Sequence, residues 1–233
     1  MSVAGAGRGA LTLFDLDATL LPIDSDHGWC EFMVELGWVE GEAFRSANDR
    51  FYAAYLAGRH DIHAYIGFAT APLLARSDAE LRAGYARFMR EVIEPAIRPQ
   101  ALALVDSHRA RGDRLAIVTS THELIVAPIV TAFGLDPVEQ MIATRLARDA
   151  QGRLTGTIDG VAAFRDGKVA RVGQWLARSG ETPGDFDAVV VYSDSPNDLP
   201  LLEMATEPVA TNPSADLAAI ARARGWKILN LFA

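Results

Sequence analysis

The sequence predicts an α/β fold in which helices cover both faces of a parallel sheet, with an all-helical insertion near the N-terminus. Short apolar runs bounded by turn residues alternate with apolar patterns of helical period over most of the chain. Parallel strands need crossover connections long enough for a helix, so this alternation favours a parallel sheet. The interval 21–98 contains no convincing strand and is therefore expected to be the helical insertion.

The expected strands share an apolar run that is bounded by turn residues. They are 11–15, 114–120, 140–146, 188–194, 207–211 and 227–231. The expected helices between them have apolar residues at helical spacing. They are 99–111, 122–133, 168–179 and 214–224. After the third strand, the segment 147–160 is expected to leave the sheet as a hairpin with Gly152 in its turn.

The insertion contains two clear helical patterns of apolar residues. The first consists of Trp29, Phe32, Met33 and Leu36, and the second of Leu81, Tyr85, Phe88, Met89 and Val92. A capping-box pattern, Ser77 followed by Glu80, precedes the second helix. Two more helices are expected to fill 40–75.

The length of 233 residues, half of them apolar, is enough for a buried core with an inserted subdomain. We expect residues 1–20 and 99–233 to form the core, and residues 21–98 to form the helical subdomain. The single cysteine, Cys30, excludes an internal disulfide and is compatible with a reducing compartment. Because Cys30 lies in an apolar helical pattern, we expect a buried thiol.

The net charge of −8 and the isoelectric point near 5.1 leave no basic stripe for nucleic acid or for an anionic membrane surface. No apolar run is long enough for a signal-peptide core or a membrane span, so we expect a soluble cytoplasmic protein. The glycines of "GAGRG" precede the first strand instead of following it. They are therefore expected to belong to a flexible N-terminus and not to a phosphate-binding loop.

Polar residues follow three of the expected strands, at the points where ligands bind in open parallel sheets. They are Asp15, Asp17 and Thr19 after the first strand, Thr119 and Ser120 after the second, and Asp194, Ser195, Asn197 and Asp198 after the fourth. Several carboxylates at one crevice repel each other, so a cation or shifted pKa values must stabilise them. Oxygen ligands without histidine or cysteine favour a hard ion, and Mg²⁺ is the natural choice. Hydroxyls such as that of Thr19, helix N-terminal amides and Lys168 suit a phosphate dianion.

Four motifs in this order, "DLDATL", "IVTST", the lysine of "RDGK" and "SDSPND", resemble those of the haloacid dehalogenase (HAD) superfamily of phosphatases. The helical insertion is similar to the type 1 cap of that superfamily, as found in subfamily IB members that resemble phosphoserine phosphatase. The resemblance covers residues 11–212 and implies a three-layer, Rossmann-like, HAD-like core. Two positions depart from the usual pattern, because Ala18 stands where glycine or serine is commoner and Ser193 replaces a common glycine.

The resemblance implies a role for each motif in phosphoryl transfer. Asp15 matches the nucleophile, which forms an aspartyl-phosphate, and Asp17 matches the general acid and base. Thr119 matches the hydroxyl that binds the transferring phosphoryl group, with Ser120 as the alternative. Lys168 matches the cation that pairs with the nucleophile and the phosphate.

The fourth motif is implied to hold the metal and the substrate. Asp194 matches a ligand of Mg²⁺, together with Asp15 and the backbone carbonyl of Asp17. Asp198 would hold the metal through water or position the other groups, although it also suits the N-cap of the helix "LPLLEM". Asn197 would contact the phosphate or the substrate.

Two histidines outside these motifs have simpler interpretations. His108 is expected at the surface. His122 follows the second motif, where it can cap the next helix or touch the phosphate, and we favour the cap.

The first residues of the insertion lie closest to the nucleophile, so Asp24, Ser25 and Asp26 are candidates for binding the leaving group. In phosphoserine phosphatases an acidic residue follows the nucleophile by the same interval as Asp24. An acidic residue there favours an amine-bearing phosphomonoester. The alternative for Asp24 and Ser25 is N-capping of the helix that follows.

The sequence thus predicts a Mg²⁺-dependent phosphatase for a small, amine-bearing phosphomonoester. Phosphoserine also needs a partner for its carboxylate, and the arginines of the insertion, Arg45, Arg50 and Arg59, offer no unambiguous match. Histidinol phosphate lacks the carboxylate and suits an acidic cap, so we favour it slightly. A phosphotransferase or mutase of the same fold and a non-catalytic phosphate-binding protein are the alternatives. We expect a monomer or homodimer.

Overall fold

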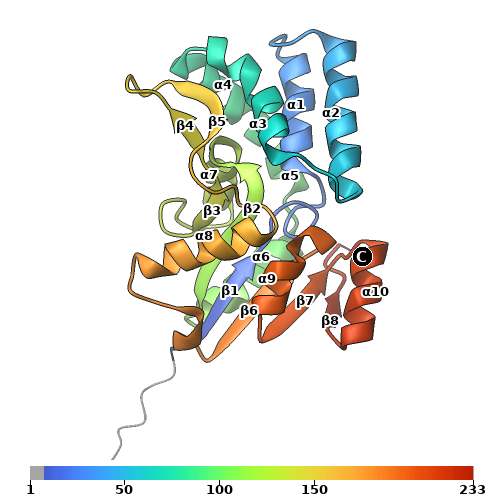
Figure 1. Cartoon of the computed structure of the whole chain (residues 1–233), viewed down its shortest axis with the longest axis vertical. Coiled ribbons are helices and arrows are strands. Elements are labelled where there is room, and N and C mark those ends of the chain that lie inside the picture. The colour runs from blue at the N-terminus through green and yellow to red at the C-terminus, as the bar shows by residue number, and fades with distance from the viewer. Residues whose placement is uncertain (1–7, 233) are drawn as a thin grey trace, which may run out of the picture.

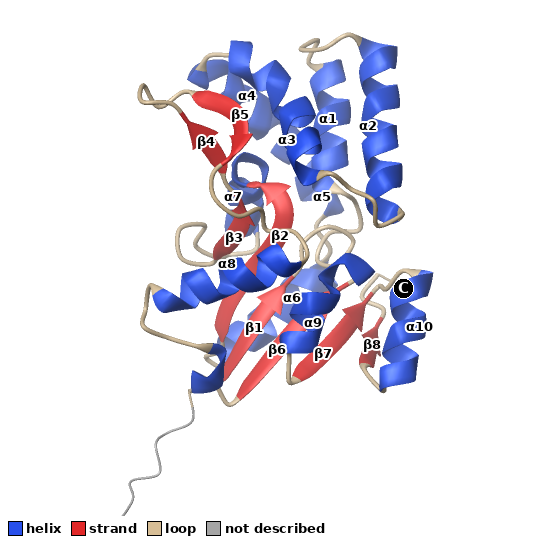
Figure 2. Ribbon diagram, in the orientation of Figure 1, coloured by secondary structure: helices blue, strands red, loops and turns tan. Residues whose placement is uncertain are grey.

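The computed structural model describes residues 8–232 and has a six-stranded parallel sheet at its centre. The strand order is β3-β2-β1-β6-β7-β8 (Figure 2). The strands are β1 (Ala10–Phe14), β2 (Arg114–His122), β3 (Met141–Thr144), β6 (Ala188–Ser193), β7 (Glu207–Thr211) and β8 (Lys227–Leu229). The order reverses between β1 and its two neighbours, β2 and β6, which places the ligand crevice of an open sheet at the carboxyl end of β1.

Helices pack on both faces of the sheet. They are α6 (Pro99–Ala110) and α7 (Glu123–Ala132) on one face, and α8 (Asp166–Ala177), α9 (Leu199–Met204) and α10 (Ala215–Arg224) on the other. The alternation along β1 explains this arrangement, because Leu11 and Leu13 belong to the core with α8, α9 and α10 while Phe14 belongs to the core with α6 and α7. The expected parallel sheet with helices on both faces is confirmed.

The insertion after β1 is helical and lies above the strand ends (Figure 1). It contains α1 (Ser25–Glu35), α2 (Gly41–Leu56), α3 (Ile62–Thr70), a 3-10 turn (Ala71–Ala75), α4 (Asp78–Phe88), a π-helical turn (Met89–Ile93) and α5 (Glu94–Ala96). Its core is aromatic: the ring of Trp29 lies 4.3 Å from that of Tyr85 and 5.3 Å from that of Phe88. Both halves of the capping box expected at Ser77 and Glu80 are present.

The segment after β3 forms the expected hairpin, in which β4 (Leu146–Arg148) pairs with the antiparallel β5 (Leu154–Ile158). The expectation of a single strand at 140–146 is wrong, because β3 ends at Thr144 and the chain leaves the sheet there. The hairpin packs against the insertion (Figure 1). A Cβ atom at Gly156 would lie 3.4 Å from Leu74.

The exposure of His108 is the second sequence-based prediction that the structure corrects. The residue is 3% exposed. Its Nδ1 lies within hydrogen-bond distance of the hydroxyl of Thr12, at 3.0 Å, and of Oδ2 of Asp113, at 2.7 Å. Its Nε2 lies 2.8 Å from the hydroxyl of Tyr192. Polar partners on β1, β6 and the loop before β2 therefore pair this histidine inside the protein, which a helical pattern alone does not reveal.

Other expectations concern burial and location. Cys30 is buried, as expected. None of the helices in the described part of the chain is long and apolar enough to span a membrane. The flexible terminus expected at "GAGRG" falls largely on residues 1–7, outside the described residues. The division at 20 and 98, the cytoplasmic location and the oligomeric state stay predictions.

Candidate active site

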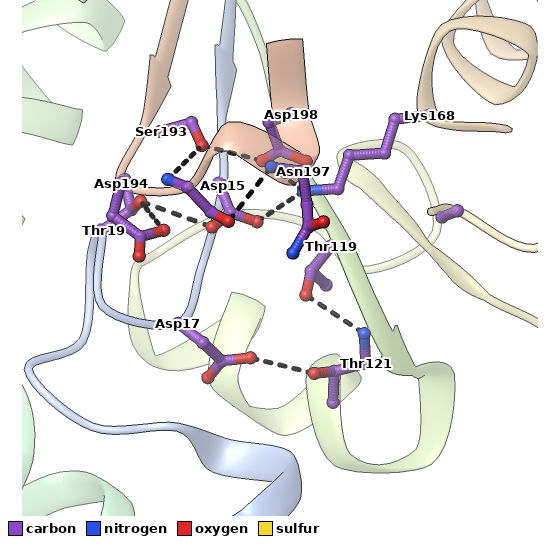
Figure 3. Close-up of polar contacts among 12 residues, drawn as sticks. Asp15, Asp17, Thr19, Thr119, Thr121, Lys168, Ser193, Asp194, Asn197 and Asp198 are labelled. Carbon is purple, nitrogen blue, oxygen red and sulfur yellow. Dashed lines mark hydrogen bonds and ion pairs between the residues drawn. The ribbon is translucent and has the colours of Figure 1, made fainter. Parts of the chain in front are cut away.

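The candidate site lies at the carboxyl ends of β1, β2 and β6 (Figure 3). The backbone N–H of Asp15 donates to the carbonyl of Tyr192 at 2.9 Å, which continues the pairing of β1 with β6 past the end of the strand. The chain then turns sharply at Ala18, whose φ of 55° is unusual for a residue with a side chain. A small residue fits this turn, which is consistent with the glycine or serine common there in the family that the motifs resemble.

A buried lysine joins two carboxylates. Nζ of Lys168 lies 2.7 Å from Oδ1 of Asp15 and 2.6 Å from Oδ2 of Asp198. All three side chains are at least nine-tenths buried. Although burial opposes the charge of Lys168, the two carboxylates raise the pKa of its ammonium above its usual value. Lys168 therefore carries a full positive charge against Asp15 at neutral pH.

The sequence before Lys168 explains its position. Lys168 lies in the first turn of α8, and a Cβ atom at Gly167 would lie only 2.0 Å from the carbonyl oxygen of Ala162. Glycine is therefore required beside the lysine, which gives the "GK" pair a structural reason. Arg165, just before the helix, has a positive φ of 51°.

Asp198 occupies the N-cap position of α9, but its side chain makes no capping hydrogen bond. It instead accepts a hydrogen bond from the hydroxyl of Ser193 at 2.8 Å, in addition to that from Lys168. Burial and the charge of Asp15 raise the pKa of Asp198 to about 6, against the opposing effect of Lys168. Ser193, in the place of a common glycine, thus supports Asp198.

A hydroxyl lies between two acidic groups next to this network. The hydroxyl of Thr19 is 3.3 Å from Oδ2 of Asp15 and 3.3 Å from Oδ1 of Asp194 (Figure 3). Burial and the charges of Asp15 and Asp198 raise the pKa of Asp194 well above its ordinary value. Asp15 and Asp194, which share this hydroxyl, offer oxygen donors that suit a hard divalent cation.

Asp17 points away from Asp15 and toward β2 (Figure 3). Its Oδ1 accepts from the backbone N–H of Ser25 at 2.7 Å and its Oδ2 accepts from the hydroxyl of Thr121 at 2.9 Å. Burial, assisted by the charge of Asp24, raises the pKa of Asp17 to about 7. A carboxyl group with this pKa can both give and take a proton near neutral pH.

Thr121 is a residue that sequence reasoning missed. It is buried, and it lies two residues past Thr119, next to the last residue of β2, His122. The run "TSTH" has three hydroxyls in a row, and the third was the available signal. The hydroxyl oxygen of Thr119 accepts from the backbone N–H of Thr121 at 3.2 Å, which orders the end of the strand.

Thr119 and Ser120 both line the same cavity as Asp15 and Asp17. Thr119 is 1% exposed and Ser120 is half-buried. Thr119 and its alternative, Ser120, therefore both border the cavity that contains Asp15.

Asn197 contacts the insertion. Its Nδ2 donates to the backbone carbonyl of Tyr55 at 3.2 Å, and its Oδ1 accepts from Arg165 at 3.4 Å. Arg165 also donates to the carbonyl of Gly58, just past the end of α2. Two side chains of the core thus hold the carboxyl end of α2 over the site.

The expectation that the His122 side chain caps α7 is wrong. Its backbone occupies the N-cap position, but the side chain makes no capping bond. The ring is completely buried, and neither nitrogen has a hydrogen-bond partner within the described residues. Burial lowers the pKa of His122 to about 3. The ring is therefore neutral at pH 7.

The cavity above Asp15 lies between the strand ends and the helices α1, α2 and α3 of the insertion. It is lined by Asp15, Asp17, Asp24, Asp26, His27, Asn48, Phe51, Tyr52, Tyr55, His60, Ile62, Tyr65, Thr119, Ser120 and Thr121. Within the described part of the chain, this lining contains no lysine or arginine. The cavity is therefore strongly acidic and aromatic.

Asp24 both caps helix α1 and lines the cavity. Its Oδ1 caps α1 by accepting from the backbone N–H groups of Asp26 and His27, at 3.0 and 2.7 Å. Burial raises the pKa of Asp24. Ser25 is completely buried and its side chain does not line the cavity, so it acts on the site through the backbone bond to Asp17.

Comparison with known proteins agrees with this geometry. The profile of the haloacid dehalogenase-like hydrolases matches residues 12–203. The chain belongs to this family. The family expected from the four motifs is confirmed, and so is the expected class of enzyme, a phosphatase of this family.

Two relatives match nearly the full length of this chain. Histidinol-phosphatase from Neisseria meningitidis serogroup C (strain 8013) is 41% identical over 220 residues, which cover 94% of this chain and 98% of that protein. A crystal structure of a protein with unknown function from Bordetella pertussis Tohama I has a TM-score of 0.90 at 45% identity and covers 97% of this chain and 100% of its own.

A substrate-bound phosphoserine phosphatase complex is a more distant structural neighbour. Its TM-score is 0.66 at 18% identity, over 96% of this chain and 94% of that chain. This similarity shows that the haloacid dehalogenase-like fold with a helical cap, expected from the sequence, is shared. From here on, the insertion is called the cap.

Proposed function

We propose that this phosphatase is a Mg²⁺-dependent phosphomonoesterase that hydrolyses histidinol phosphate through an aspartyl-phosphate on Asp15. One observation supports the chemistry above all: Asp15 is held by the ammonium of Lys168, while Asp17, two residues away, has a pKa of about 7. A carboxylate attacks a phosphate dianion poorly unless its charge is balanced. A second carboxyl group that exchanges protons at neutral pH completes the requirements for ester cleavage.

In the first half of the reaction, a carboxylate oxygen of Asp15 forms a bond to phosphorus and the bond from phosphorus to the alcohol oxygen breaks. Asp17, in its protonated form, gives its proton to that departing oxygen. Lys168 offsets the charge on the phosphoryl oxygens. The hydroxyl of Thr119, or that of Ser120, donates a hydrogen bond to one of them.

In the second half, water attacks phosphorus and the bond to Asp15 breaks. Asp17, now a carboxylate, takes the proton from that water and returns to its starting form. Phosphate leaves and Asp15 is restored. The raised pKa of Asp17 suits both steps, because the same group must hold a proton in one and accept it in the other.

Asp15, Asp194 and the backbone carbonyl of Asp17 would hold Mg²⁺. Their all-oxygen donors fit a hard cation, and burial together with the charges of Asp15 and Asp198 raises the pKa of Asp194, an effect that a bound cation would offset. When bound, the ion would neutralise phosphoryl charge and help to align Asp15 with phosphorus.

The cavity favours an amine-bearing leaving group without a carboxylate. Asp24 faces it, and its lining within the described residues lacks lysine and arginine. Arg45, Arg50 and Arg59, the arginines considered for a carboxylate, are all exposed, and Arg45 donates to Glu31 and Arg50 to Ser46. Phosphoserine would place its carboxylate among aspartates without a cationic partner. The 41% identity to a protein named histidinol-phosphatase supports the same choice.

The test is Mg²⁺-dependent phosphate release from histidinol phosphate, phosphoserine, a sugar phosphate and a generic aryl phosphate. We expect the highest kcat/KM for histidinol phosphate, and no release by Asp15→Asn. Asp24→Ala should lower the preference for amine-bearing esters relative to the aryl phosphate. Preference for phosphoserine, or an unchanged rank order in Asp24→Ala, contradicts the assigned substrate or the role of Asp24. Transfer of the phosphoryl group to an added alcohol in preference to water would favour a phosphotransferase.

A further inference from the structure

Three buried polar atoms of the cavity lining lack a hydrogen-bond partner among the described residues. They are Oδ1 of Asp26, Oδ1 of Asn48 and Nδ1 of His60, and all three residues line the cavity. Buried polar groups in folded proteins are nearly always paired, because an unpaired one loses its hydrogen bonds to water without replacement. Three unpaired polar atoms around one cavity, two of them oxygens of Asp26 and Asn48, therefore indicate a ligand that supplies donors.

The hydrogen bonds of Asn48 determine which of its atoms is the free one. Asn48 is 1% exposed, and its Nδ2 donates to the carbonyl of His27 at 3.1 Å and to Oε1 of Glu31 at 3.2 Å. Both partners are acceptors, so the atom facing them must be the amide nitrogen. The free atom is the carbonyl oxygen, which can only accept.

Asp26 is the second acceptor, and it is the acidic member of the group. It lies in the first turn of α1 and is 8% exposed. Burial, with the charges of Asp24 and Asp17, raises its pKa well above the ordinary value. A carboxylate in these surroundings gains strongly from a cationic partner that donates a hydrogen bond.

The remaining walls of the cavity are aromatic. Phe51, Tyr52, Tyr55 and Tyr65 line it, and the ring of His60 lies 5.2 Å from that of Tyr65. Flat aromatic walls suit a flat ring, and they attract a cation through the negative faces of their π-systems. An aliphatic ammonium alone would cover only part of this flat surface, whereas a ring can stack on it.

We propose that Asp26 and Asn48 are specificity-determining residues that accept the N–H groups of a flat nitrogen heterocycle on the leaving group, which in histidinol phosphate is the imidazole ring. Asp24 is left to bind the amine. The inference rests on the proposed function, since it assigns the part of that substrate farthest from phosphorus. An imidazole ring offers up to two donors, and Asp26 and Asn48 offer the two acceptors.

The test compares two substrates that differ in the ring. Histidinol phosphate and 2-aminopropyl phosphate share the ester and the amine, and only the first has an imidazole. We expect Asp26→Asn to lower the ratio of their kcat/KM values by roughly ten- to a hundredfold, as for loss of a charged hydrogen bond. Asn48→Leu, which keeps the approximate size but removes the acceptor, should lower it by roughly threefold to tenfold. Asp78→Asn is the matched control, because Asp78 is an exposed aspartate in the first turn of the cap helix α4, and the ratio should not change.

A second measurement separates binding from folding. Histidinol, the product, should inhibit aryl phosphate hydrolysis, and its inhibition constant should rise in Asp26→Asn and Asn48→Leu by the same factors as the ratio falls. The melting temperature of Asp26→Asn should equal or exceed that of the wild type, because Oδ1 of this buried acid has no partner among the described residues and burial opposes its charge.

The outcomes distinguish the two proposals. A wild type that shows no preference for histidinol phosphate over 2-aminopropyl phosphate overturns the proposed substrate and this inference with it. A wild type that has the preference, with Asp26→Asn and Asn48→Leu retaining it, overturns the assignment of these residues and leaves the proposed function standing. If one variant does not fold, the other decides through its histidinol inhibition constant.

Discussion

The hydroxyl of Ser193 donates a 2.8 Å hydrogen bond to Oδ2 of Asp198, the oxygen that also accepts from Lys168 at 2.6 Å. Lys168 in turn reaches Asp15 at 2.7 Å. The serine therefore supports, through one intermediate carboxylate, the lysine that balances the charge of the proposed nucleophile. A glycine at this position could not make the bond.

We predict that Ser193→Ala lowers kcat/KM for an aryl phosphate by roughly three- to tenfold, the effect of one hydrogen bond. Asp198→Asn should lower it further, by roughly ten- to a hundredfold, because it removes one of the two charges that hold Lys168. Steady-state kinetics with saturating Mg²⁺ checks both. Ser179→Ala, at an exposed serine, is the control. Equal activity of Ser193→Ala and the wild type would contradict the supporting role.

Thr121 should control the pH dependence of the reaction. Its hydroxyl donates to Asp17 at 2.9 Å and so favours the charged carboxylate, which lowers the pKa of Asp17 from what burial alone would produce. The first half-reaction needs protonated Asp17, so kcat/KM should fall as the pH rises through the pKa of about 7. Thr121→Val removes the donor, raises this pKa and should move the alkaline limb to higher pH.

The measurement for Thr121 is kcat/KM for an aryl phosphate between pH 5 and 9, with Thr131→Val as control. Thr131 is exposed on α7, and its hydroxyl donates to the carbonyl of Ala127 in the same helix. A limb that moves to lower pH, or that does not move, would show that Thr121 does not act on the group that titrates.

The polar cluster could be predicted from the sequence because its residues follow the ends of parallel strands. Parallel strands end at one edge of the sheet, so Asp15, Asp194 and Thr119 had to lie near one another once the strands were recognised. Lys168 was placed by its motif, and the structure shows that its ammonium reaches the same point from α8. These contacts depend on strand ends, which hydrophobic patterns locate well.

Other contacts depend on how elements pack, and no local pattern contains that information. His108 has an ordinary helical setting, and only the approach of Tyr192 and Asp113 makes it a buried residue. In the same way, Asn197 bonds the carbonyl of Tyr55, which lies 142 residues away in the chain. Capping hydrogen bonds also depend on side-chain rotamers, so Asp24 caps its helix while His122 does not.

Magnesium should stabilise the protein against heat. Asp15 and Asp194 approach one hydroxyl, that of Thr19, so an ion bound to both carboxylates would relieve their repulsion. At a Mg²⁺ concentration 100 times the dissociation constant, linkage predicts about 2.7 kcal/mol of added stability. Thermal unfolding with Mg²⁺ and with EDTA measures it.

Asp194→Asn should lose most of this Mg²⁺-dependent shift, and in EDTA it should melt at or above the wild type because one charge of the repelling pair is gone. Asp216→Asn changes an exposed aspartate on α10 and should keep the full shift. A full shift in Asp194→Asn would place the ion elsewhere.

His122 should make the fold sensitive to acid. Its pKa is about 3 in the folded protein because the ring is completely buried, against 6.5 in an unfolded chain. Below pH 6.5 the unfolded chain binds a proton that the folded protein does not, so stability from this residue is complete above pH 6.5 and is lost progressively as the pH falls toward 3. Between pH 7.5 and pH 5 the loss amounts to about 2 kcal/mol.

His122→Leu removes the titrating group and the two unpaired nitrogens, so its free energy of unfolding should fall by about 2 kcal/mol less than that of the wild type over this range. Urea denaturation at pH 7.5 and pH 5 measures the difference. The same substitution at exposed His63 is the control and should leave the wild-type pH dependence intact. If the free energy of unfolding falls equally in His122→Leu and in the wild type, the buried ring can take a proton without cost. The described residues around the ring provide no hydrogen-bond partner for either nitrogen, so we expect that proton to be costly.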